Sequence, residues 1–128
     1  MPKLNKIVAF VATRNAGKAK EFYHEKLGLR FVSDDGFALV FDIAGTMFRI
    51  ARVKEIAVAP YTVLGWEVLN IERAVSDLVE KGVTFERFPG LAQDKLGIWT
   101  APSKDKVAWF KDPDGNILSL SEHPGRKG

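Results

Sequence analysis

The chain has 128 residues, a length typical of one domain. With 46% hydrophobic and 27% charged residues it can bury a core, which argues against intrinsic disorder. It contains no cysteine, so disulfides, thiolate metal sites, iron–sulfur clusters and a cysteine nucleophile are excluded. The net charge is only +3, because Lys and Arg are interleaved with Asp and Glu along the chain.

The pattern of basic and apolar residues excludes further classes of protein. The start, Met1 to Lys6, is basic but no long apolar run follows it, so we predict no secretory signal. No stretch approaches the roughly 20 apolar residues that span a bilayer. The basic cluster Arg126-Lys127 stands in a Pro/Gly tail, which is more typical of a frayed end than of a nucleic-acid arm. We therefore expect a cytoplasmic protein with no nucleic-acid or membrane partner.

The first half of the chain predicts a strand, a helix and three more strands. Residues 5–13 are rich in β-branched and aromatic residues, as strands are. Asn15 is a suitable N-cap for a helix that runs to Leu27, where Gly28 would end it. Turn residues then separate short strands near 29–33, 36–43 and 46–53.

The second half repeats this order after a linker at residues 54–61. Thr62–Leu69 is predicted as a strand, and Asn70 as the cap of a helix that ends at Lys81-Gly82. Further strands are expected near 83–88, 96–100, 106–110 and 117–121. Apart from one additional strand in the second half, each half has the order β-α-β-β-β. We predict an α+β fold of two modules, about 4–53 and about 62–123, in a single domain of residues 1–128.

Two motifs resemble those of a known family. Phe22-Tyr23 followed by Leu27-Gly28 is similar to a helix end common in glyoxalase, bleomycin-resistance and extradiol-dioxygenase proteins. The run from Asp112 to Asn116 is similar to the hairpin that opens their last strand. With the doubled order, the chain resembles the vicinal oxygen chelate superfamily. The resemblance implies cup-shaped mixed sheets around a cavity, with helices on the convex side, and a homodimer.

Alternation along strands predicts which side chains face the cavity. In the first strand Ala9 and Val11 would face the helix, and Phe10 the cavity. In the repeat, Leu64 and Trp66 would face the helix, and Glu67 the cavity. Gly45 of the first closing strand aligns with Gly115 of the second. That alignment places Arg49 opposite Ser119 on the cavity face, with Phe48, Ile50, Leu118 and Leu120 behind.

Metal-dependent members of the superfamily carry His or Gln near the start of each first strand and Glu in each closing strand. The corresponding positions in this chain are Lys6, Val63, Arg49 and Ser119. None is a strong ligand, and Lys and Arg would repel a cation. We therefore expect no metal and no other cofactor. The histidines, His24 and His123, are expected to be ordinary surface residues.

Ser119, Ser121 and His123 alternate on one face of the last predicted strand, which suggests a nucleophile and a base. Residues two apart in a strand are roughly 6–7 Å apart, too far for a hydrogen bond. We therefore do not expect a serine hydrolase.

Aromatic residues and two charges are the candidates for ligand binding. The aromatic candidates for the cavity wall are Phe10, Phe37, Phe41, Trp99 and Trp109, and the alternative for each is ordinary core packing. Arg49 and Glu67 would pair with each other or hold a polar ligand, unless they form structural ion pairs or lie on the surface. The predicted ligand-binding residues are Phe10, Arg49, Glu67, Trp99, Trp109 and Ser119.

The leading hypothesis is a metal-independent small-molecule binding protein that sequesters a flat aromatic compound or antibiotic, as resistance proteins of this superfamily do. The alternative is a metal-dependent lyase, epimerase or dioxygenase of the same superfamily. A metal-free enzyme with Glu67 as general base and a purely structural or regulatory partner are further alternatives. The sequence assigns no catalytic residue.

Overall fold

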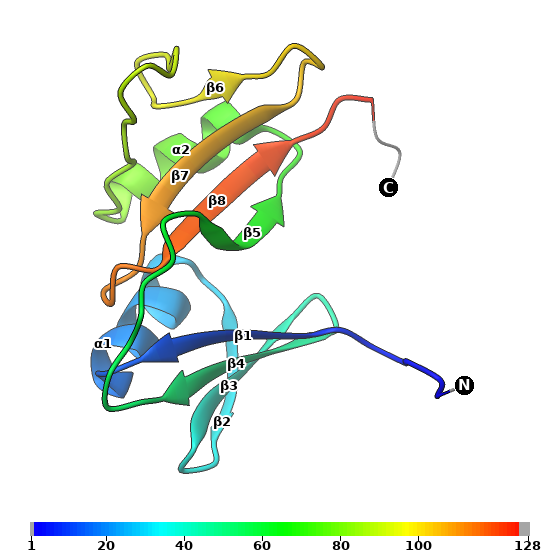
Figure 1. Cartoon of the computed structure of the whole chain (residues 1–128), viewed down its shortest axis with the longest axis vertical. Helices are drawn as coiled ribbons and strands as arrows, with labels where there is room; N and C mark the ends of the chain where they lie inside the picture. Colours follow the sequence, from blue (N-terminus) through cyan, green and yellow to red (C-terminus); the bar gives the residue numbers. More distant parts are fainter. Residues whose placement is uncertain (1, 126–128) are drawn as a thin grey trace. The chain divides into compact units, whose positions relative to one another are not determined.

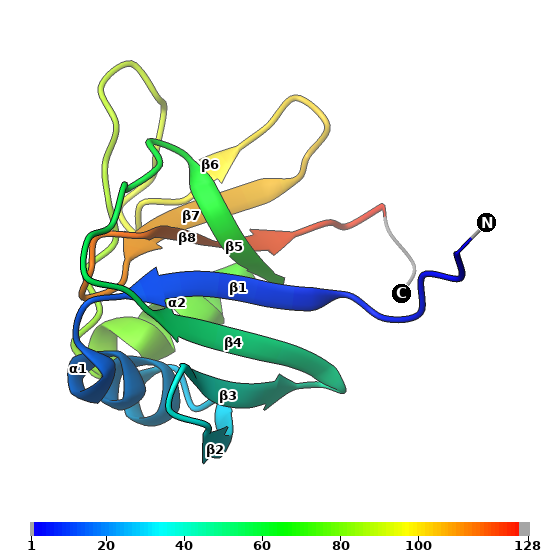
Figure 2. The same cartoon turned by 60° about the horizontal axis from the view of Figure 1, so that its bottom comes forward.

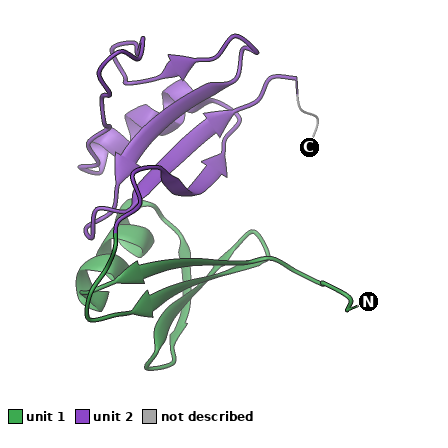
Figure 3. Cartoon of the chain, in the orientation of Figure 1, with its two compact units in different colours: residues 1–57 green, residues 58–128 purple. Residues whose placement is uncertain are grey.

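The computed structural model describes residues 2–125, and the chain divides into two compact units, Met1–Ala57 and Val58–Gly128 (Figure 3). The cluster Arg126-Lys127 lies outside the described residues. Within the described part, each unit contains one mixed four-stranded sheet and one helical segment (Figures 1 and 2). Both units follow the order β-α-β-β-β, which confirms the α+β class and the internal repeat.

Unit 1 pairs its first strand with its last. Its elements are β1 (Val8–Thr13), α1 (Ala16–Lys20), the π-helical η1 (Glu21–Lys26), β2 (Arg30–Asp34), β3 (Ala38–Ile43) and β4 (Thr46–Arg52). The sheet order is β1-β4-β3-β2, with β1 parallel to β4 and the other pairs antiparallel. Pairing with β4 begins at Val8 opposite Met47, so the strand starts three residues later than predicted.

The helical segment of unit 1 begins and ends where predicted but changes its turn in between. Asn15 Oδ1 accepts a hydrogen bond from the Lys18 N–H at 3.1 Å, and Gly28 follows the last turn with φ +71°. The Leu27 N–H donates to the Phe22 carbonyl five residues back, so the second half is a π-helix and not the continuous α-helix expected.

The core of unit 1 lies between this segment and one face of the sheet. Tyr23, Phe48 and Ile50 are fully buried, and the rings of Tyr23 and Phe48 meet at 5.3 Å. Phe41 is also fully buried and packs its ring on Tyr23 and Phe48. Of the two interpretations of Phe41, cavity wall or ordinary core packing, the second therefore holds, because its ring packs on Tyr23 of the helical segment.

Unit 2 repeats the arrangement with a shortened edge. Its elements are β5 (Thr62–Glu67), α2 (Ile71–Glu80), β6 (Trp99–Thr100), β7 (Lys106–Lys111) and β8 (Ile117–Glu122). The sheet order is β5-β8-β7-β6, with β5 parallel to β8. Gly115 before β8 has φ +89° and Gly45 before β4 has φ +90°, which confirms the alignment of the two closing strands.

The strand predicted near 83–88 does not form. An isolated bridge joins Phe85 to Phe110, and the Gln93 side chain then takes the place of a neighbouring strand. Gln93 Oε1 accepts from the Phe88 N–H at 2.8 Å, and Gln93 Nε2 donates to the Glu86 carbonyl at 3.0 Å. Because a side chain satisfies these backbone groups, no continuous ladder is needed there.

Helix α2 is fixed at its start by two side chains. Asn70 Oδ1 accepts from the Arg73 N–H at 3.1 Å, as predicted for its cap. Glu122 Oε1, at the end of β8, accepts from the Ile71 N–H at 2.9 Å. The helix packs against β7 and β8. It buries Ile71 and Val75 fully, whereas Ala74 and Leu78 are half-buried.

Candidate functional site

Strand register brings several predicted residues together on one face of the sheet in unit 2. Gly65 on β5, Ser119 on β8 and Trp109 on β7 are successive cross-strand partners. The next row contains Glu67, Ser121, Val107 and Trp99 in the same way. Glu67, Trp99, Trp109 and Ser119 therefore share one face, opposite to the face where Leu118 and Leu120 are buried.

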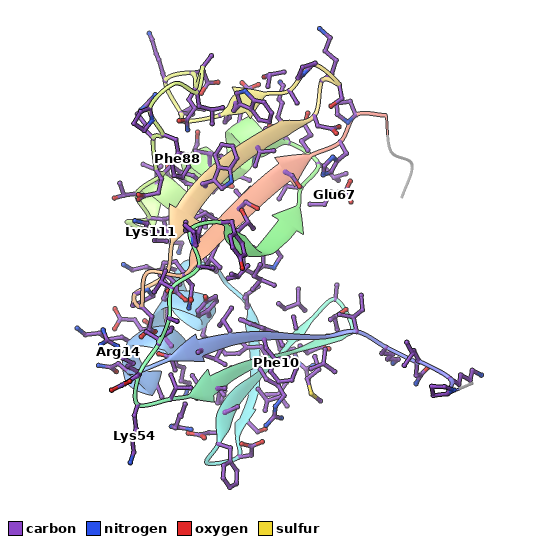
Figure 4. All side chains as sticks on the ribbon, viewed as in Figure 1. Phe10, Arg14, Lys54, Glu67, Phe88 and Lys111 are labelled. Carbon is purple, nitrogen blue, oxygen red and sulfur yellow. The ribbon has the colours of Figure 1, made fainter. Side chains whose placement is uncertain are left out.

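Three aromatic rings form a cluster on this face, which we call the aromatic cluster: Phe88, Trp99 and Trp109. The ring centroids of Trp99 and Trp109 are 6.3 Å apart at an interplanar angle of 35°. Phe88 meets Trp109 edge to face at 5.4 Å, and Figure 4 labels Phe88. Both tryptophans are partly exposed. Phe88 was not among the predicted ligand-binding residues, because it was expected at the end of a strand near 83–88.

The third tryptophan has a different role. Trp66 stacks on the buried Phe110 with centroids 6.4 Å apart and an interplanar angle of 20°. It alternates with the exposed Gly65 and Glu67 along β5, so it lies on the helix side as predicted. Trp66 therefore belongs to the core of unit 2 and not to the aromatic cluster.

The ring of His123 contacts the side chains of Ser121 and Asp105. Its Nε2 lies 2.9 Å from Ser121 Oγ, and its Nδ1 lies 3.3 Å from Asp105 Oδ1. The inference that Ser121 and His123 lie too far apart for a hydrogen bond is wrong, because His123 follows the last residue of β8 and its ring turns back over Ser121. Asp105 directly precedes β7, and continuing the pairing of Lys106 with Glu122 places it opposite His123. Nothing in the local sequence marks Asp105.

In unit 1, Phe10 and Arg49 are cross-strand partners on β1 and β4. Phe10, which is labelled in Figure 4, is 59% exposed. Arg49 reaches to the turn between β2 and β3, where its guanidinium lies 2.6 Å from Asp35 Oδ2. This hydrogen bond, with help from the N–H groups of Ala38 and Phe37, lowers the pKa of Asp35 to about 2. Arg49 therefore forms an ion pair with Asp35, one of the alternatives stated for it.

The neighbouring residue of the same turn is held similarly. Arg52 donates to both carboxylate oxygens of Asp34, at 2.6 and 2.7 Å. The Arg52 hydrogen bond, followed by one from the Gly36 N–H, lowers the pKa of Asp34 to about 2. Phe37, beside this turn, is highly exposed.

Residues 3–120 match a family model described as the glyoxalase/bleomycin resistance protein/dioxygenase superfamily. The chain belongs to this superfamily. The resemblance inferred from the Phe22-Tyr23 and Asp112 to Asn116 motifs is thereby confirmed. A comparison with curated proteins found no match.

Solved structures share the fold at low sequence identity. A glyoxalase/bleomycin resistance protein/dioxygenase from Alicyclobacillus acidocaldarius has a TM-score of 0.70 at 16% identity, with 94% of this chain and 92% of that chain covered. A lactoylglutathione lyase from Agrobacterium tumefaciens has a TM-score of 0.73 at 14% identity, covering 98% and 100%. A glyoxalase family protein from Enterococcus faecalis has a TM-score of 0.67 at 22% identity, covering 94% and 97%.

The residues at the superfamily's metal positions do not fit a divalent cation. Arg49 and Ser119 occupy the two closing-strand positions, and Arg49 already pairs with Asp35. Lys6 precedes β1, and the first residue of that strand is Val8. Among residues 2–125, no group of three or more His, Asp or Glu side chains gathers as a metal would require.

A hollow of about 300 Å³ lies elsewhere in unit 2, between the end of α2 and the loop before β6. Its lining residues are Val79, Val83, Thr84, Phe85, Arg87, Lys95, Leu96 and Gly97. It shares no residue with the aromatic cluster. No helix within residues 2–125 is long and apolar enough to cross a membrane.

Proposed function

We propose that this protein is a metal-independent binding protein that holds a flat aromatic compound, such as an antibiotic, against the aromatic cluster. The observation that carries the proposal is the pair of partly exposed indoles, Trp99 and Trp109, at 6.3 Å on one sheet face. Indole rings supply large flat surfaces that stack well on aromatic ligands.

Polar groups beside the cluster would orient the ligand. Ser119 is the cross-strand partner of Trp109, and Glu67 lies in the row that contains Trp99. We include both as ligand contacts because specificity in largely apolar sites comes from a few placed polar groups. In unit 1, Phe10 and Arg49 occupy the row equivalent to Gly65 and Ser119, and we propose them as ligand-binding residues on the sheet face of that unit.

Metal independence rests on the chemistry of the donor positions. The relative from Agrobacterium tumefaciens is named a lactoylglutathione lyase, and metal-dependent lyases were the alternative hypothesis for this chain. An ion-paired arginine and a serine hydroxyl at the closing-strand positions offer no carboxylate to a cation. We therefore propose ligand binding without a metal in place of lyase, epimerase or dioxygenase chemistry.

Tryptophan fluorescence tests the binding proposal. The protein is titrated with a panel of flat aromatic compounds, and the same titrations are made on Trp99→Phe, Trp109→Phe and the core control Trp66→Phe. We expect saturable quenching in the wild type and in Trp66→Phe, weakened in the other two variants. The proposal is overturned if no compound quenches saturably, or if quenching survives in a variant that lacks both Trp99 and Trp109.

Calorimetry tests metal independence on the same protein. We expect no heat of binding with micromolar nickel, zinc, manganese or iron(II). Binding of any of these ions at one site per chain would restore the metal-dependent enzyme as the leading function.

We further propose a cytoplasmic homodimer. Val8 and Phe10 of β1 and Met47 of β4 are exposed apolar side chains, and Val8 is the cross-strand partner of Met47. A second subunit would remove this apolar surface from water. Light scattering at micromolar concentration is expected to give twice the mass of one chain, and cell fractionation is expected to recover the protein with the cytosol. A monomer would remove the dimer from the proposal.

A further inference from the structure

Three side chains at one end of the sheet in unit 2 lie in successive contact. Ser121 Oγ lies 2.9 Å from His123 Nε2, and His123 Nδ1 lies 3.3 Å from Asp105 Oδ1. Asp105 and His123 are on opposite strands in continued register, and Ser121 is two residues before His123 on the same face. The order of contacts is therefore hydroxyl, imidazole and carboxylate.

The carboxylate determines which imidazole nitrogen carries the proton. An ionised carboxylate only accepts hydrogen bonds, so a neutral imidazole beside Asp105 is stabilised with its proton on Nδ1. Nε2 is then a lone-pair acceptor that faces the Ser121 hydroxyl. This is the arrangement that activates a serine oxygen in acyl-transfer enzymes, where it occurs on unrelated folds.

Access and charge suit this role. The side chains of His123 and Asp105 are 30% and 39% exposed, so a small molecule can reach the group. The charged side chains that face it are Asp105 itself and Glu67, which is the cross-strand partner of Ser121 on β5. Lys106 and Glu122, one residue away on β7 and β8, lie on the opposite face. There Lys106 pairs with Glu72 of α2, and Glu122 accepts a hydrogen bond from the Ile71 N–H of the same helix.

We propose that Ser121, His123 and Asp105 form a catalytic site that transfers acyl groups from activated aryl esters to water. Ser121 Oγ attacks the ester carbonyl carbon while its proton passes to His123 Nε2. The bond to the aryloxide breaks, and the phenol leaves with that proton. Water, activated by His123, then attacks the acyl-serine and releases the carboxylic acid, which restores the Ser121 hydroxyl. Asp105 acts as a positioning residue for the imidazole.

We propose an aryl leaving group because aromatic rings lie beside Ser121. Trp109 is diagonal to Ser121 across β7 and β8, since its direct partner is Ser119. Diagonal neighbours on one face have Cβ atoms about 7–8 Å apart, within reach of an aromatic ring. This choice of leaving group rests on the proposed aromatic binding site, whereas the activated serine does not.

The test uses two probes on the full chain. An alkyl fluorophosphonate, which has no aryl group, labels an activated serine with loss of fluoride, and mass spectrometry of peptides locates the label. p-Nitrophenyl acetate reports acylation and turnover through release of nitrophenol. The variants are Ser121→Ala, His123→Asn and Asp105→Asn. The matched controls are Ser76→Ala, an exposed serine of α2, and His24→Asn, a surface histidine of η1, with circular dichroism to confirm folding of each.

We expect labelling at Ser121 that is retained in both controls and reduced about 100-fold or more in His123→Asn. In Asp105→Asn the maximal labelling rate should fall while the probe concentration that gives half of that rate stays unchanged, because Asp105 positions the imidazole and does not touch the probe. The proposal is overturned if the wild type is unlabelled, if the label lies on another residue, or if His123→Asn is labelled as fast as the wild type. Labelling without any quenching by aromatic compounds would instead remove the binding proposal and leave the activated serine.

Discussion

Gly65 on β5 and Ser119 on β8 lie so close that no Cβ atom fits between them. A Cβ built on Gly65 would be 2.7 Å from Ser119 Oγ and 3.3 Å from the Ser119 carbonyl oxygen. Ser119 is only 9% exposed, so its side chain has little room to move. The glycine is therefore required by a close approach of two strands and not by a special backbone angle.

Gly65→Ala should lower the free energy of unfolding by about 1–3 kcal/mol, the usual cost of overpacking, as measured by denaturant unfolding. The double variant Gly65→Ala with Ser119→Ala should regain part of the loss, since it removes the closer of the two contacts. Gly17→Ala is the control, because its Cβ would meet only Asn15 Oδ1 at 3.6 Å. A loss in Gly17→Ala equal to that in Gly65→Ala would contradict this account.

The ion pair of Asp35 with Arg49 should make stability depend on acid pH. The Asp35 pKa is lowered from 3.8 to about 2 in the folded protein, so the unfolded chain binds this proton first as pH falls. The stabilisation is complete above pH 3.8 and is lost between there and about pH 2. Asp35→Asn should therefore be less stable at neutral pH and lose less stability on acidification.

Acid titrations of denaturant midpoints measure this effect. Asp77→Asn, at an exposed position of α2, serves as the control with the same charge change. If Asp35→Asn and Asp77→Asn showed the same pH dependence as the wild type, the ion pair would have no role in acid stability.

The Asp112 carboxylate holds the turn into β8. Its Oδ1 accepts from the N–H groups of Asp114 and Asn116, both at 2.9 Å, and its Oδ2 accepts from Asn116 Nδ2 at 2.8 Å. Asp112→Ala removes these acceptors from buried donors and should cost about 2–4 kcal/mol. Asp112→Asn keeps one acceptor oxygen and should cost less. Equal melting temperatures for the two variants would argue against the hydrogen bonds as the cause.

Glu122 should stabilise the start of α2 from another element. Its Oε1 accepts from the Ile71 N–H at 2.9 Å, one of the N–H groups that a helix leaves without an internal partner. Glu122→Ala should cost about 1 kcal/mol in thermal unfolding, whereas Glu122→Gln, which keeps the acceptor, should cost less. A larger loss in Glu122→Gln than in Glu122→Ala would refute this role.

The sequence predicted the repeat and the strand faces well, because alternation leaves a strong signal when one face is buried. Phe48 and Ile50 of β4 and Leu118 of β8 are buried as expected, and the glycines before both strands have the same backbone angle. The π-helical turn after Lys20 and the side-chain bridging by Gln93 could not be predicted. Both replace regular backbone pairing with contacts specific to the tertiary structure.

The candidate site was predictable only to the level of a shared face. Trp99, Trp109, Ser119 and Glu67 lie on one face because pairing register follows from the hydrophobic pattern. Whether Arg49 forms an ion pair depends on the distance between the Asp34-Asp35-Gly36 turn and β4. No local sequence pattern encodes that distance. The contact of His123 with Asp105 likewise depends on the course of the chain beyond the last paired residue.

The pairing of the first strand of each unit with its last has a consequence for synthesis on the ribosome. β1 gains its neighbour only when β4 has left the exit tunnel, and β4 is also the neighbour of β3. Until β4 emerges, β1 lacks the only strand that it pairs with in the sheet of unit 1. Unit 1 then has all four strands of its sheet outside the tunnel before β5, the first strand of unit 2, emerges.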